Sequence, residues 1–137
     1  MPELPEVETV VRGLAPELTG RRVLAVNVRE TRLRGGVAPE FAERLTGRAF
    51  KHLGRRGKYV LATLDDGRVW LVHLGMTGRL TLAPESRADE VHDHIVLRLD
   101  DGRLLTYNDA RRFGRMAVGA HSFTVRRLKR GTYRGVL

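Results

Sequence analysis

The sequence predicts a mainly β fold with flanking helices, namely an antiparallel β-sandwich that carries a helix at its N-terminus. Apolar residues recur with helical spacing near the start of the chain, and from residue 49 onward short apolar runs alternate with turn residues. That second part also lacks the long amphipathic segments of an α/β fold. At 137 residues the chain suffices for one hydrophobic core but not two. We therefore expect one domain over residues 1–119.

The predicted N-terminal helix rests on five apolar residues at positions i, i+3, i+4, i+7 and i+11: Val7, Val10, Val11, Leu14 and Leu18. Pro5 suits the first turn of a helix, and Glu6 and Glu8 suit the positive end of its dipole. Gly20 ends this region. Residues 22–28 are then predicted to form a strand, and residues 39–46 a short helix that stops at Gly47.

Two later segments, residues 60–79 and 95–115, share one layout with an offset of 35 residues. Each has an apolar strand, an Asp-Asp-Gly-Arg turn and a second strand that ends in a polar loop. Asp-Gly between apolar runs is a strong hairpin signal. We expect two similar hairpins whose exit loops share one face, with Met76 of one loop opposite Arg111 of the other. The alternative is that the two turns coincide by chance.

The composition excludes several classes of protein. The chain has no cysteine, so it holds no disulfide, iron–sulfur cluster or cysteine zinc site. No apolar run approaches the roughly 20 residues that span a bilayer, and the acidic start argues against a secretory signal. We expect a soluble, cytoplasmic monomer.

The formal charge of +9 indicates a polyanionic partner such as nucleic acid. This charge is uneven, because five of the 25 basic residues and no acidic residue lie in residues 121–137. Residues 120–137 therefore form a basic tail. The alternative is a general arginine bias on a solvated surface.

The opening stretch MPELPEVETVVRGL suggests amine chemistry. Removal of Met1 would leave Pro2 as an N-terminal secondary amine, whose adduct with a sugar aldehyde is a cationic iminium and an electron sink for later elimination. The α-amino group titrates near pH 8, at about 7.7–8.0, and the positive end of the following helix should lower its pKa. Glu3 could transfer a proton, and Glu6 could cap or brace the helix. The alternative is a helix that merely begins Pro-Glu.

Lys58 is a second candidate for this chemistry. The chain has three lysines and 22 arginines, and lysine can give up its proton whereas arginine in a protein cannot. Lys58 within RRGKYV therefore suggests ammonium chemistry, although a solvated strand end would also explain it.

The segments PELPEVETVVRGL, RRGKYV, HLGMTG, HDH and YNDARRFG, in this order and spacing, closely resemble the N-terminal domain of bacterial formamidopyrimidine-DNA glycosylase over roughly residues 2–119. The related endonuclease VIII, which opens Pro-Glu-Gly-Pro, is less similar. The resemblance implies a base-excision repair enzyme that removes oxidised purines, such as 8-oxoguanine and formamidopyrimidines, from double-stranded DNA. It also implies strand cleavage at the abasic site by β- and δ-elimination.

The same resemblance implies roles for individual residues. Pro2 would attack the sugar C1′ to form a Schiff base, Glu3 would help open the deoxyribose ring, and Lys58 would contact phosphate and assist proton transfer. Further candidates for DNA binding are His92, Arg111, Met76, Phe113, His73 and Asn108. An enzyme that acts on a base must first extrude it, and Met76, Arg111 and Phe113 suit the gap left behind. The alternatives are a core methionine at position 76 and a loop anchor at position 113.

The chain departs from the family pattern after residue 119. Complete members continue through a helix–two-turn–helix module to a four-cysteine zinc finger, which we expect to be absent here, so no cofactor is expected. His92 and His94 form a poor metal pair, because no third ligand clusters with them. Two other functions remain open. One is a noncatalytic DNA-binding remnant, and the other is an N-terminal-proline tautomerase acting on small keto acids, which would leave YNDARRFG unexplained.

Overall fold

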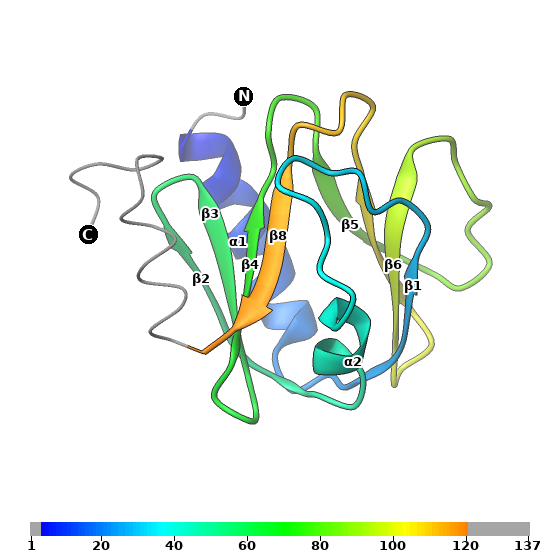
Figure 1. The fold of residues 1–137 in the computed structure, drawn as a ribbon. Helices are drawn as coiled ribbons and strands as arrows, with labels where there is room; N and C mark the ends of the chain where they lie inside the picture. The colour runs from blue at the N-terminus through cyan, green and yellow to red at the C-terminus, as the bar shows by residue number, and fades with distance from the viewer. Residues whose placement is uncertain (1–3, 121–137) are drawn as a thin grey trace.

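Two antiparallel four-stranded sheets form the body of the molecule in the computed structural model, which describes residues 4–120 (Figure 1). One sheet has the order β1-β6-β7-β5 and the other β2-β3-β4-β8. The strands are β1 (Val23–Val28), β2 (Phe50–Arg56), β3 (Tyr59–Leu64), β4 (Val69–His73), β5 (Arg79–Ala83), β6 (Asp93–Leu99), β7 (Leu104–Asn108) and β8 (Arg115–Gly119). The predicted sandwich is confirmed.

The N-terminal helix is α1 (Leu4–Leu18), as its apolar spacing predicted. Val7, Val11, Leu14 and Leu18 are buried. The helix packs mainly against β2 and also contacts β5. Because these are edge strands of different sheets, α1 covers one open side of the sandwich.

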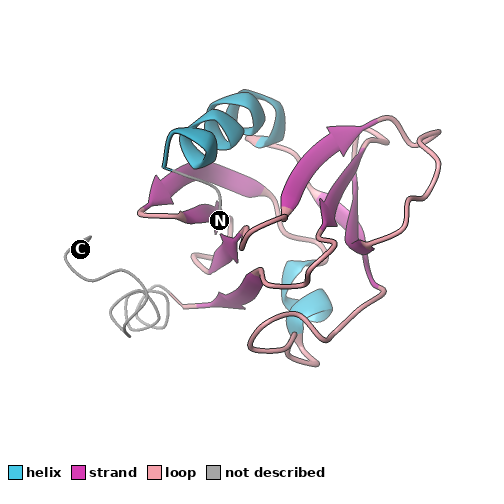
Figure 2. Ribbon diagram, turned by 90° about the horizontal axis from the view of Figure 1, so that it is seen from above, coloured by secondary structure: helices cyan, strands magenta, loops and turns pink. Residues whose placement is uncertain are grey.

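The second helix, α2 (Phe41–Leu45), falls within the predicted segment 39–46. It contacts β1 and β8, which are the two remaining edge strands. Figure 2 shows the two helices on opposite sides of the strands. Each helix therefore covers one open side, which protects unpaired strand edges. Neither helix is long and apolar enough to cross a bilayer, within the residues described.

The core lies between the sheets and joins both helices to them. Trp70 of β4 is its largest fully buried side chain. Its ring lies 6.5 Å from that of Phe41 and 6.2 Å from that of Phe50, centroid to centroid. These contacts join α2 and the start of β2 to the middle of a sheet, so the main core connects both sheets and both helices.

The two predicted hairpins are β3–β4 and β6–β7. Their turns are closed in the same way, because Asp66 accepts a hydrogen bond from the Arg68 amide and Asp101 accepts one from the Arg103 amide, each at 3.0 Å. The glycines that follow, Gly67 and Gly102, have φ of 87° and 88°, which is the left-handed region that favours glycine. The shared turn geometry favours the hairpin interpretation over chance, but the two hairpins belong to opposite sheets.

Candidate functional site

The loops that leave the two hairpins meet at one end of the molecule (Figure 1). We call residues 74–78, between β4 and β5, the first loop and residues 109–114, between β7 and β8, the second loop. The Thr77 hydroxyl of the first loop donates a hydrogen bond to Asp109 Oδ1 of the second at 2.6 Å. The Arg111 amide donates back to Thr77 Oγ1 at 3.2 Å. The common face predicted for these loops is therefore present.

Asp109 is the centre of this contact. It is fully buried, and besides Thr77 its carboxylate accepts hydrogen bonds from the Tyr107 hydroxyl at 2.6 Å, the Gly114 amide at 2.9 Å and the Arg111 amide at 3.3 Å. Burial raises the pKa of Asp109, but the hydrogen bonds from Thr77, Tyr107 and the two amides outweigh it and lower the pKa below its usual value. An ionised carboxylate thus joins both loops to strand β7.

Three glycines leave room for this packing, and a Cβ atom at Gly75 of the first loop would lie 2.6 Å from the Gly114 amide nitrogen of the second. A Cβ atom at Gly78 would collide with the Leu74 carbonyl oxygen, and one at Gly114 would collide with the Tyr107 hydroxyl. The motifs HLGMTG and RRFG therefore contain glycine because a side chain at these positions would not fit between the packed segments.

The side chains at the tips of the loops point to solvent. Met76 is 50% exposed and Phe113 is 38% exposed, and the Arg111 guanidinium carbon lies 4.7 Å from the centre of the Phe113 ring. A cation this close to an aromatic face is attracted to it. The alternative of a core methionine at position 76 is wrong, and the site presents two apolar tips and one cation.

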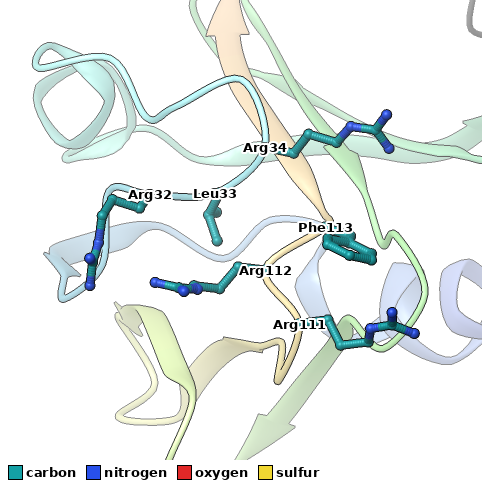
Figure 3. Close-up of a pocket in the computed structure, with 6 residues that line it drawn as sticks. All are labelled: Arg32, Leu33, Arg34, Arg111, Arg112 and Phe113. Carbon is teal, nitrogen blue, oxygen red and sulfur yellow. The ribbon is translucent and has the colours of Figure 1, made fainter.

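A cavity of about 600 Å³ lies beside the second loop (Figure 3). Its lining residues are Arg32, Leu33, Arg34, Arg111, Arg112 and Phe113. The Arg34 amide donates hydrogen bonds to the carbonyl oxygens of Arg112 at 3.2 Å and Gly114 at 3.1 Å, which fixes residues 32–34 against the second loop. Sequence reasoning missed Arg32 and Arg34, because RLRGG matches no motif and lies between elements.

The start of α1 borders the same end of the molecule. A cavity of about 240 Å³ is lined by Glu6 and Val10 of α1 together with Leu74, Gly78, Arg79, Leu80 and Thr81. The predicted catalytic residues Pro2 and Glu3 lie outside the described residues, and Glu6 is exposed in the first turn of the helix.

Lys58 lies in the turn between β2 and β3. The Arg55 guanidinium Nε of this hairpin donates a hydrogen bond to Glu8 Oε1 at 2.9 Å, which attaches the hairpin to α1. Figure 1 shows the tip of the hairpin near the start of the helix. Lys58 and the helix start therefore belong to one region.

His73 differs from the sequence-based expectation of a residue that faces DNA. It is 4% exposed, and its Nδ1 accepts a hydrogen bond from the Gly75 amide at 2.9 Å. Burial lowers the pKa of His73 to about 4, and the nearby charges of Arg115, Lys58 and Arg34 act in the same direction. In this structure His73 is a buried, neutral imidazole that supports the first loop, and its contact with DNA stays a prediction.

Asn108 is also buried rather than surface-exposed. Its amide donates hydrogen bonds to the Val91 carbonyl oxygen at 3.0 Å and to Asp93 Oδ1 at 2.9 Å. Asn108 therefore supports the segment at the start of β6, and its contact with DNA stays a prediction.

The two histidines of the HDH segment differ in exposure, although their ring centroids lie 6.1 Å apart. His92 is exposed and has φ of 74°, whereas His94 is buried and its Nε2 lies 2.6 Å from the Asp109 carbonyl oxygen. Within residues 4–120 no three histidine or acidic side chains converge on a metal-binding position. Of the pair, His92 is the residue available to a partner.

A β-sandwich flanked by an N-terminal helix, with exposed Met, Arg and Phe side chains on two joined loops, defines the class of DNA glycosylase domain that the sequence motifs indicated. Residues 1–116 match the formamidopyrimidine-DNA glycosylase N-terminal domain. The chain belongs to this family.

Curated relatives and solved structures agree with this assignment. Formamidopyrimidine-DNA glycosylase of Geobacter sulfurreducens is 53% identical over 114 residues, which are 83% of this chain and 42% of that protein. The enzyme of Methylocella silvestris is 47% identical over 133 residues, covering 89% and 46%. The chain therefore spans less than half the length of these relatives.

The fold is similar to that of Lactococcus lactis Fpg in complexes with DNA. The complex with FAPY-dG-containing DNA gives a TM-score of 0.84 at 30% identity over 92% of this chain and 47% of that one. A complex with abasic-site DNA gives 0.85 at 30% identity, covering 93% and 47%.

Proposed function

We propose that the chain is the N-terminal catalytic part of a base-excision DNA repair enzyme. It would remove oxidised purines, such as 8-oxoguanine and formamidopyrimidines, from double-stranded DNA, and it would act as a monomer. Family membership supports this proposal, as do the L. lactis relatives in complex with FAPY-dG and abasic-site DNA.

The observation that carries the proposal is the pair of loops joined through Asp109. A base that leaves the duplex for an active site leaves a gap and an unpaired partner. Apolar side chains that enter the stack stabilise such a distorted duplex, and an arginine can hydrogen-bond the unpaired base. Met76, Phe113 and Arg111 supply these groups from loops that are held together.

The proposed chemistry begins after removal of Met1. The neutral amine of Pro2 attacks C1′ of the damaged nucleotide, a C1′–N bond forms, and the bond to the base breaks as the base leaves with a proton. Glu3 donates the proton that opens the deoxyribose ring. Loss of a C2′ proton to a base then breaks the C3′–O bond, and a second elimination breaks the C5′–O bond. Lys58 binds the adjacent phosphate and assists proton transfer, and Glu6 braces the helix start.

A noncatalytic DNA-binding remnant is the second candidate. It is favoured by the exposed Met76, Arg111 and Phe113 side chains, which suit a DNA duplex without any need for the N-terminal amine. Phosphate contacts dominate affinity for DNA, so a domain that binds DNA need not also cleave it. It predicts DNA binding that survives loss of Pro2.

Two substitutions separate the proposed roles. Pro2→Gly should lower cleavage of an abasic-site duplex by about 100-fold or more, because its primary amine gives an imine that must first be protonated to become an electron sink. Met76→Ala should change that cleavage by less than about threefold, since no base remains to be extruded, but should lower release of 8-oxoguanine by about tenfold.

The readout is gel-resolved strand cleavage together with release of the free base, under single-turnover conditions. An unchanged cleavage rate for Pro2→Gly would contradict the proposed nucleophile. Equal losses for both variants on the abasic-site duplex would contradict the division of roles.

A further inference from the structure

Arg34 is a cation at the edge of the proposed DNA-binding loops that no motif singled out. It lines the 600 Å³ cavity together with Arg111 and Phe113. Figure 3 shows the guanidinium groups of Arg34 and Arg111 extending to the same side, with the Phe113 ring between them. Two cations therefore flank one exposed aromatic tip.

The four arginines of the cavity differ in their ion pairs. Arg32 Nε lies 2.9 Å from Glu30 Oε2, and Arg112 Nη1 lies 3.4 Å from Glu30 Oε1. Hydrogen bonds from Arg32 lower the pKa of Glu30 to about 2, so Glu30 stays ionised. Among residues 4–120, the side chains of Arg34 and Arg111 form no salt bridge. The charges of Arg32 and Arg112 are therefore partly balanced by Glu30, whereas no acidic side chain among the described residues balances those of Arg34 and Arg111.

The backbone fixes where the charge of Arg34 can reach. Its amide hydrogen bonds to Arg112 and Gly114 hold its Cα against the loop that carries Phe113. If the Phe113 ring enters the base stack, Arg34 lies beside the ring and not in line with it. Its side chain then faces the sugar–phosphate backbone that forms the wall of the groove. Phosphate oxygens are the DNA groups most often contacted by arginine.

We propose that Arg34 binds a phosphodiester group of the duplex beside the step that Phe113 enters. This inference rests on the proposed function, because it requires the two loops to face DNA. Arg34 then acts with Arg111 on either side of the aromatic tip, one side chain on the backbone and the other on the unpaired base.

Three variants of the full chain test this assignment. Arg34→Gln removes the charge and leaves the main-chain hydrogen bonds, and Arg34→Lys keeps the charge. Arg32→Gln is the matched control, since it removes an arginine from the same segment and cavity that already pairs with Glu30. The probe is a short labelled duplex that carries a tetrahydrofuran abasic-site analogue, and its dissociation constant is measured by fluorescence anisotropy across a series of NaCl concentrations.

Arg34→Gln should weaken binding by about fivefold at 0.1 M salt and reduce the slope of log K against log salt by about 0.9, the value for one phosphate contact. Arg34→Lys should keep the wild-type slope, and Arg32→Gln should change the affinity by less than about twofold. Unchanged melting temperatures would show that the variants are folded.

Several results would overturn the assignment. They are an Arg34→Gln variant with wild-type affinity and slope, an Arg34→Lys variant no better than Arg34→Gln, an equal loss in Arg32→Gln, or a wild-type chain that binds no duplex. The proposed function fails in a separate way: the wild type binds DNA and the variants behave as predicted, but damaged or abasic-site DNA is never cleaved.

Discussion

At His73, burial and neighbouring charge act in the same direction. The ring lies beneath the first loop, and its pKa falls from the ordinary 6.5 to about 4 because burial disfavours the imidazolium and because Arg115, Lys58 and Arg34 are near. A neutral ring can keep accepting the hydrogen bond from Gly75. Burial therefore sets the protonation state of the residue that supports the first loop, and the nearby cations reinforce it.

This shift predicts a pH dependence of stability. Below pH 6.5 the unfolded chain binds a proton at His73, whereas the folded chain does not until about pH 4. Stability that is fully present above pH 6.5 should therefore be lost as the pH falls through this window, by up to about 3 kcal/mol. Urea denaturation measured from pH 7.5 to pH 4 should show the loss.

His73→Gln removes the titrating group while keeping an acceptor for the Gly75 amide, so its stability should change less over the same window. His52→Gln, at an exposed position of β2, should retain the wild-type slope. If His73→Gln and the wild type lose stability in parallel, the shifted histidine is not the cause.

At the residue scale, the exposed tips could be predicted but their supports could not. Met76, Arg111 and Phe113 stand in recognisable motifs, and the structure places them on adjacent loops. Asp109 lies within YNDARRFG, yet its four donors come from separate positions of the chain. His73 and Asn108 were predicted to bind DNA, and their burial was not foreseen, because a motif identifies a residue without showing whether a neighbour covers it.

The two hairpins and their exit loops form the next level of organisation. The repeated turn predicted both hairpins, because Asp-Gly chemistry acts within four residues. It did not predict that β3–β4 and β6–β7 belong to opposite sheets, since strand pairing depends on contacts distant in sequence. Likewise, the apolar stripe of α1 predicted a buried face but not the two strand edges that it covers.

Asp109 is the group that couples these elements, and its replacement should be costly. Asp109→Asn keeps the size of the side chain but offers an NH₂ group to donors that need an acceptor. We expect a loss of about 2–3 kcal/mol in the free energy of unfolding, measured by urea denaturation at pH 7. Faster hydrogen exchange at the Arg111 and Gly114 amides should accompany it.

Asp101→Asn is the matched control for this substitution. Asp101 also accepts a backbone and a side-chain hydrogen bond. It lies, however, in an exposed turn in which Asn-Gly is as acceptable as Asp-Gly. It should cost less than about 1 kcal/mol. Equal losses for the two variants, or unchanged exchange at Gly114 in Asp109→Asn, would contradict the coupling role.

For the whole molecule, the two helices and the shared core hold the start of α1, the β2–β3 turn and both loops at one end of the sandwich (Figures 1 and 2). This arrangement is consistent with the proposal that the N-terminal amine, Lys58 and the exposed loop side chains act on one duplex. The formal charge of +9 favours such a polyanionic partner.

Borohydride trapping with an abasic-site duplex, read by intact mass, tests the N-terminal amine chemistry most directly. The expected result is a covalent DNA adduct on a chain that lacks Met1, with the adduct lost in Pro2→Gly. A chain that has lost Met1 and binds the duplex but gives no adduct would contradict catalysis by this chain and favour the DNA-binding remnant.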